Sequence, residues 1–112
     1  MKKFLVLYQS TVPVSEQMRN ATPEQAKAGM DAWMSWAGQA GSGLVDLGSP
    51  VAPTAKLTGA DQVAASNAQV GGYSILQAES KDGLMDLLKN HPHFMAPGGS
   101  IEVFEFLPMP GM

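Results

Sequence analysis

The sequence contains no cysteine and only two histidines among its 112 residues. Without cysteine, disulfide bonds, thiol nucleophiles and thiolate metal sites are excluded together, and a reducing compartment is favoured. Any Ser-His-Asp triad would have to use His91 or His93, and the sequence has no Gly-x-Ser-x-Gly nucleophile elbow. We therefore expect a cytoplasmic protein for which few catalytic chemistries remain open.

Charged residues and long apolar runs are also scarce. Seven basic and ten acidic residues give a net charge of −3, and the basic residues form no stripe that would follow a nucleic-acid backbone. The apolar run at 4–8 is too short for a signal peptide, and no stretch approaches a membrane span. The glycines of "GSGLVDLGS" (41–49) lead from a helix into a strand, the reverse of a dinucleotide loop. We expect one domain over residues 1–112, with no nucleic acid, membrane or cofactor as partner.

Apolar, β-prone runs alternate with helix signals along the chain. Strands are expected over residues 3–9, 44–51, 73–79 and 100–108, and helices over residues 22–41 and from Ser80 to about Asn90. Residues 10–21 are typical of a polar loop, and residues 52–71 favour a loop with one or two short strands. This order predicts an α+β, ferredoxin-like split βαβ arrangement, in which an antiparallel sheet carries two helices on one face.

The first expected helix has the clearest start in the sequence. Thr22 is a good N-cap, Pro23 suits the first helical position, and Gln25 completes a capping box. The apolar residues that follow at helical spacing predict a stripe that packs on the sheet: Ala26, Gly29, Met30, Trp33, Met34, Ala37 and Ala40. Trp36 lies off the centre of this stripe.

Both faces of the expected sheet are apolar. Alternation along the first strand places Phe4, Val6 and Tyr8 on one face and Leu5 and Leu7 on the other. Two helices that cross over the same side cover only one face, and an exposed apolar face of that size is unusual in a monomer. A second copy of the sheet would cover it, so we expect a homodimer with twofold symmetry.

Four segments, taken in order, resemble the YCII-related, DGPF-type family: "DAWMSWAGQAGSGLVDLGSPV" (31–51), "VGGYSILQAES" (70–80), "NHPHF" (90–94) and "GGSIEVFEFLPM" (98–109). The resemblance implies a ferredoxin-like fold that pairs as a dimeric α/β barrel. It implies little about activity, because most members of the family have no assigned reaction.

The sequence departs from that family at both of its signature sites. One branch carries a histidine on the first helix, at a position that falls near Met30 here. The other carries Asp-Gly-Pro-Phe ahead of a Gly-Gly-Tyr strand, where this chain reads "TGADQVAASNAQVGGY" (58–73) with Asp61 as the only remnant. Glu102 matches the family's glutamate in the last strand, where register, the interface and chemistry are all open roles.

Asp46 and His91 are the candidate acid–base residues. Asp46 is a carboxylate inside an apolar strand, where burial would raise its pKa; the alternative is an exposed edge position beside Gly48. His91 lies on the apolar side of the second helix, near a negative helix end that would favour a cation. The alternative for the His-Pro-His stretch is that it only ends the helix. We predict no metal site, because two histidines would need a further ligand such as Asp46 or Glu102.

The candidate ligand-binding residues are Tyr8, Trp33, Trp36, His93 and Glu102, with core packing as the alternative for the two tryptophans. Three functions remain open. The first is a small homodimer that binds an apolar or amphipathic ligand. The second is a cofactor-independent enzyme that uses Asp46 or His91, and the third is a purely structural homo-oligomer. The missing family signatures favour the first.

Overall fold

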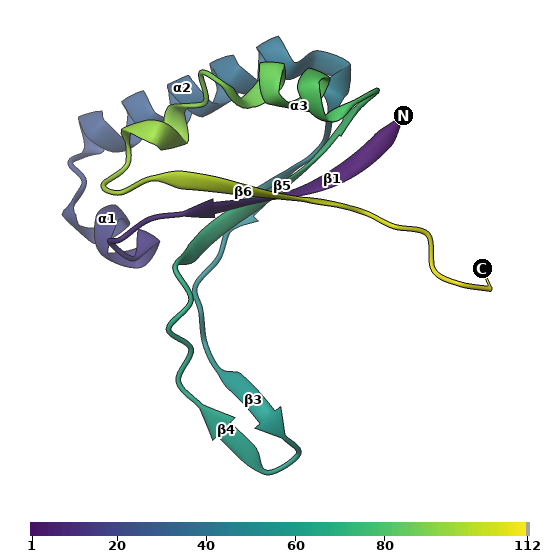
Figure 1. Cartoon of the computed structure of the whole chain (residues 1–112). Coiled ribbons are helices and arrows are strands. Elements are labelled where there is room, and N and C mark those ends of the chain that lie inside the picture. The colour runs from purple at the N-terminus through teal and green to yellow at the C-terminus, as the bar shows by residue number, and fades with distance from the viewer. Residues whose placement is uncertain (112) are drawn as a thin grey trace.

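The computed structural model describes residues 1–111, which form a four-stranded sheet, three helices and a projecting hairpin (Figure 1). In chain order the elements are β1 (Lys2–Gln9), α1 (Val14–Asn20), α2 (Pro23–Ala40), η1 (Gly41–Gly43), β2 (Leu44–Pro50), β3 (Lys56–Gly59), β4 (Gln62–Ala64), β5 (Val70–Ala78), α3 (Lys81–Leu88), η2 (Pro92–Met95) and β6 (Ser100–Glu105). Within these residues, each helix is too short or too polar to cross a membrane.

The four-stranded sheet is antiparallel throughout, with the strand order β2-β5-β1-β6. The connections from β1 to β2 and from β5 to β6 cross the same face, so α2 and α3 lie together on one side of the sheet (Figure 1). The architecture is therefore α+β with an antiparallel sheet, as the sequence predicts, and its strand order is compatible with a ferredoxin-like fold.

Local sequence signals set the ends of the two long helical segments. Thr22 and Gln25 form the expected capping box, in which each side chain accepts the backbone N–H of the other, at 3.1 and 2.9 Å. Gly41 ends α2 with a φ of 55°, a conformation that favours glycine. Ser80 begins α3 by accepting the N–H of Gly83 at 3.1 Å. The predicted helix starts are confirmed.

The core lies between the sheet and these helices. Phe4, Val6 and Tyr8 of β1 point toward the helices and are each at most 5% exposed. The other buried apolar residues of the core are Trp36, Ala40, Leu76, Ala78, Leu84 and Leu88. The indole Nε1–H of Trp36 donates to the carbonyl of Leu87 at 2.8 Å, which joins α2 to the end of α3.

The buried side of α2 differs from the predicted stripe. Trp33, Ala37 and Ala40 of that stripe pack on the core as predicted. Ala26, Gly29, Met30 and Met34 are exposed, and Trp36, expected off the centre of the stripe, is buried. In this orientation the large indole of Trp36 is buried and its N–H has an acceptor. The free energy gained from this burial exceeds the cost of leaving the flexible side chains of Met30 and Met34 in water.

Three other parts of the sequence-based prediction differ from the structure. Residues 10–21 contain the short helix α1, which begins after Pro13. The third predicted strand begins at Val70 instead of residue 73, and the last strand ends at Glu105 instead of residue 108. The last residue pair of β6 is Glu105 with Phe4, and Phe106 N–H still donates to the carbonyl of Lys3 at 2.9 Å.

Residues 51–69 leave the body of the molecule and form what we call the arm. Its hairpin pairs β3 with β4, with Leu57 directly opposite Val63. Every residue of the arm is exposed except Ser66, which is half-buried. The sequence predicted one or two strands here, and the two that form pair with each other and stand apart from the main sheet (Figure 1).

The side of the sheet opposite the helices is called the open face. One row across it joins Ile75, Leu5 and Phe104, and the next joins Tyr73, Leu7 and Glu102. The helices α2 and α3 lie on the opposite side of the sheet, and the short helix α1 lies at the end of β1, where Val14 is next to Gly71 (Figure 1). Phe104 is 46% exposed and the aliphatic side chains of both rows are half-buried.

Gly48 is the position where the fold tolerates a side chain least. Its φ is 81°, and a Cβ there would overlap the backbone carbonyl of Tyr73. We expect Gly48→Ala to lower the free energy of unfolding by at least about 2 kcal/mol, from the left-handed backbone and the overlap together.

Gly38→Ala is the matched control in a urea denaturation series. Gly38 lies in the last turn of α2 with open space around it, so alanine should stabilise the protein by roughly 0.5–1 kcal/mol. Equal effects of the two substitutions would contradict the described backbone of β2.

Candidate functional site

Five of the residues selected from the sequence come together at one end of the core. Tyr8 is contributed by β1, Trp33 and Trp36 by adjacent turns of α2, and His91 and His93 by the turn that follows α3. We call this group the histidine–aromatic cluster. The i, i+3 spacing in α2 puts both indoles on one side of the helix, where they meet the turn.

His91 lies at the centre of the cluster. Its ring centroid is 4.3 Å from that of Trp36, 4.5 Å from that of Trp33 and 4.8 Å from that of Tyr8. The Trp33 ring meets His91 edge to face, with an interplanar angle of 83°. Only 2% of His91 is exposed, so three aromatic rings take the place of water around an imidazole.

The hydrogen bonds of the two histidines fix their tautomers. His91 Nδ1 accepts the backbone N–H of His93 at 2.9 Å and caps the turn Pro92–Met95. A neutral His91 therefore carries its proton on Nε2. His93 Nε2 lies 2.6 Å from the carbonyl of Gln9, which only accepts, so this nitrogen carries a proton as well.

His91 Nε2 is buried and has no hydrogen-bond partner among the described residues. Burial, and then the neighbouring His93, lower the pKa of His91 from 6.5 to about 4. The expected cation at a helix end is thus wrong: His91 is neutral at physiological pH, and its acceptor nitrogen is occupied by the backbone.

Tyr8 is equally constrained. Its hydroxyl donates to Ser74 Oγ at 2.9 Å, and Ser74 in turn donates to the carbonyl of Leu47 at 2.6 Å. Burial raises the pKa of Tyr8 to about 12, against a smaller opposite effect of the hydrogen bond to Ser74. At neutral pH the cluster therefore holds a protonated phenol and a neutral imidazole, neither open to solvent. These two side chains therefore contribute to packing in their uncharged forms.

The two acidic candidates lie outside the cluster. Asp46 is exposed in β2, where its Oδ1 accepts the N–H of Gly48 at 2.9 Å. The prediction that Asp46 acts as a base required it to be buried, and the described residues 1–111 leave it exposed. Glu102 is exposed on the open face beside Leu7, on the other side of the sheet from His91. Within the described part of the chain, no three histidine or carboxylate side chains converge on a possible metal position.

An apolar groove of about 210 Å³ lies beside the cluster's turn, on the helix side of the sheet. Its lining residues are Met85, Leu88, Lys89, Phe94, Ile101 and Val103. We call it the β6 groove, because β6 is an edge strand that α3 is too short to cover fully. Lys89 is its only charged lining residue and makes a long ion pair with Asp86, at 3.9 Å.

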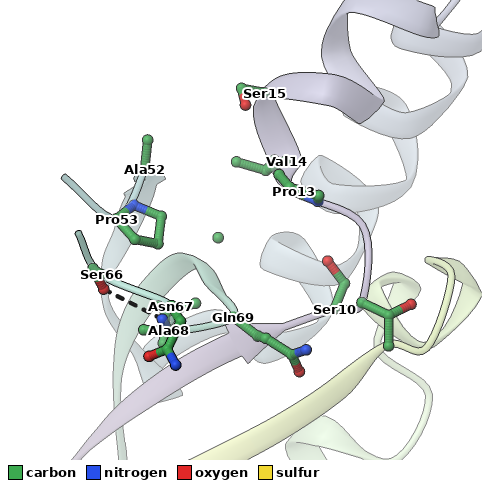
Figure 2. A pocket seen from close by; sticks show the side chains of 13 residues that line it. Ser10, Pro13, Val14, Ser15, Ala52, Pro53, Ser66, Asn67, Ala68 and Gln69 are labelled. Carbon is green, nitrogen blue, oxygen red and sulfur yellow. Dashed lines mark hydrogen bonds between the residues drawn. The ribbon is translucent and has the colours of Figure 1, made fainter.

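A second hollow of about 330 Å³ lies where the arm leaves the body (Figure 2). The segment from Ser10 to Ser15 forms one wall, and the two arm bases, with Pro53 and Asn67, form the other. The residues that line it offer hydroxyl, amide and backbone groups without charge. The hollow therefore has no side-chain charge to attract a ligand of opposite sign.

Sequence reasoning missed the β6 groove. Leu88, Ile101 and Val103 were identifiable as apolar, and alternation placed the last two on the helix face. The missing information was that α3 ends at Leu88 and leaves the sheet edge partly uncovered. Lys89, directly after the apolar pair Leu87-Leu88, was the available signal for a charged rim.

Burial of a neutral His91 makes stability depend on pH. The folded pKa is below the unfolded value, so the stabilisation is complete above pH 6.5 and is lost as the pH falls from 6.5 to about 4. We expect a loss on the order of 3 kcal/mol over this window, measured by urea unfolding at each pH. His91→Asn, which keeps a capping acceptor without a titrating ring, should flatten this part of the profile. An unchanged slope in that variant would contradict the assignment.

No known family model matches the chain, and no curated protein sequence is significantly similar to it. Its function therefore has to be argued from its own residues.

Proposed function

We propose that this protein is a homodimer whose two sheets pack by their open faces, and that each protomer binds a small apolar or amphipathic ligand in the β6 groove. The observation that carries the proposal is the apolar open face, which the chain's own helices leave bare. Kinship with the YCII-related family and a dimeric α/β barrel belong to the same proposal, on the four segments quoted above.

The composition of the open face supports a protein partner. Leu5, Leu7 and Ile75 stand in its centre with Phe104 beside them. Leu5 has the apolar neighbours Ile75 and Phe104 on the adjoining strands, whereas Leu7 has Tyr73 on one side and Glu102 on the other, and Asp46 lies opposite Ile75. Leaving such a patch in water is unfavourable by about 25 cal/mol per Å² of apolar surface. Monomers seldom expose a contiguous patch of this kind.

A second copy suits this face better than an unrelated chain. The charged groups near the apolar centre are of both signs, Lys3 on β1, Asp46 on β2 and Glu102 on β6. A twofold axis through the face brings the charges of each copy toward the partner's sheet, where Lys3 can pair with a carboxylate. The apolar content of the face is complementary to itself, and the charges around it allow pairing across the axis.

The β6 groove supports binding of a small molecule. Five of its six lining residues are apolar, and two of them, Met85 and Phe94, adapt well to varied ligand shapes. At about 30 Å³ for a water-sized group, 210 Å³ holds roughly seven non-hydrogen atoms. Lys89 at the rim favours a ligand with an acidic head, such as a short-chain carboxylate.

The enzymatic alternative has no specific support. Asp46 is solvated and His91 is enclosed by aromatic rings, so neither reaches a shared space where a substrate would sit. A purely structural homo-oligomer remains the outcome if the β6 groove binds nothing.

The dimer is tested by placing a charge on the open face. We expect the unmodified protein to sediment as a dimer at micromolar concentration and Phe104→Glu to sediment as a monomer with an unchanged far-UV circular dichroism spectrum. Met34→Glu, at a similarly exposed methionine on the outer side of α2, should stay dimeric. A monomeric unmodified protein would overturn the proposal.

The ligand is tested with a matched pair of probes, hexanoate and hexanol, followed by amide chemical shifts. We expect millimolar binding of both, with shifts concentrated at Met85, Leu88 and Val103. Lys89→Met should weaken hexanoate about 2- to 5-fold, the range for an exposed ion pair, and leave hexanol unchanged. Val103→Trp should fill the groove and abolish both. Shifts spread over the surface, or equal loss of both probes in Lys89→Met, would argue against this site.

A further inference from the structure

The arm is a long projection whose base is hydrogen-bonded to the body, while every residue of its hairpin, β3 and β4, is exposed. A two-stranded hairpin on its own is at best marginally stable in water. Here Leu57 and Val63 face each other across the hairpin and are 65% and 64% exposed. An exposed apolar pair on an ordered hairpin is typical of a surface that contacts another molecule.

The composition of the arm points the same way. Exposed hairpin edges are usually protected by lysines, by other charges or by proline within the strands. Residues 51–69 contain only Lys56 and Asp61 as charges, no aromatic residue, and six alanines. Small side chains allow another backbone to approach closely, and the shortage of charge leaves the edges of β3 and β4 available for contact.

The position of the arm indicates which surface it meets. It extends from the side of the sheet that faces away from α2 and α3, so it projects past the open face (Figure 1). The sheet continues directly into its base, where Val51 N–H donates to the carbonyl of Gly71 at 3.0 Å. Open face and arm therefore form one continuous surface.

We infer that the arm of each protomer packs against the body of the second copy, with Leu57 and Val63 buried in that contact. The inference rests on the homodimer proposed above. Under twofold symmetry the contact is made twice, because each protomer extends an arm and receives one, and the assembly closes as a dimer.

The area available on the open face supports this role for the arm. Strands β1, β2, β5 and β6 have 8, 7, 9 and 6 residues, and with a rise of about 3.4 Å per residue and a spacing of about 4.8 Å they give a footprint of about 500 Å². A stable interface buries about 800 Å² on each partner. A second copy that touched only the sheet would form a small contact, and the two arms supply the remaining area.

The absence of cysteine allows a direct test with a single introduced thiol. The variant is Leu57→Cys, and sedimentation first gives its dimer dissociation constant. The rate of its reaction with 5,5′-dithiobis(2-nitrobenzoate) is then measured at protein concentrations below and above that constant. We expect the rate constant to fall at least 10-fold when the dimer forms. Met34→Cys on the outer side of α2 is the control, and its rate constant should not depend on protein concentration.

A second measurement uses charge. Leu57→Asp with Val63→Asp should raise the dimer dissociation constant at least 10-fold, while Met30→Asp with Met34→Asp, at comparably exposed methionines, should not. If the dimer forms and the Leu57→Cys thiol stays fully reactive, the arm is free and this inference fails while the open-face dimer stands. If no dimer forms at any concentration, both fail together.

Discussion

The helices α2 and α3 both lie on one side of the sheet, and this constraint determines where the core forms and which face of the sheet they leave exposed. The connections from β1 to β2 and from β5 to β6 cross the same face, so α2 and α3 compete for the same surface. Trp36 links the two helices on this surface. Its indole is buried, and its N–H donates to the carbonyl of Leu87 in the last turn of α3. The opposite face receives none of this cover and keeps its leucines and Phe104 available for another molecule.

The histidine–aromatic cluster shows how such a core accommodates a polar ring. His91 satisfies one nitrogen with a local backbone N–H and surrounds the other with aromatic faces. Burying an imidazole in this way is tolerable only in its neutral form. The same residues that looked like a chemical site in the sequence thus close one end of the core, and the β6 groove lies beside the turn that carries them.

The parts of the fold that sequence predicted are those set by neighbouring residues. Thr22, Gln25 and Ser80 act within one helical turn, and strand alternation correctly separated Phe4, Val6 and Tyr8 from Leu5 and Leu7. The side of α2 that is buried depends instead on Leu87, 51 positions away from Trp36, so the stripe through Met30 and Met34 was the wrong choice. Likewise, nothing within the His-Pro-His stretch reveals that two tryptophans enclose it. The hairpin of the arm carries no apolar periodicity that would reveal a buried side, and all residues of β3 and β4 are exposed.

The outer edge of β2 limits how far the sheet extends. Its pairing with β5 is irregular on both sides of Asp46, Gly48 bends the backbone through a positive φ, and Pro50 lacks an N–H. A strand interrupted in this way is a poor template for adding another strand. The irregular edge of β2 therefore disfavours edge-to-edge pairing of sheets from many copies into fibres, even though the neighbouring open face is apolar.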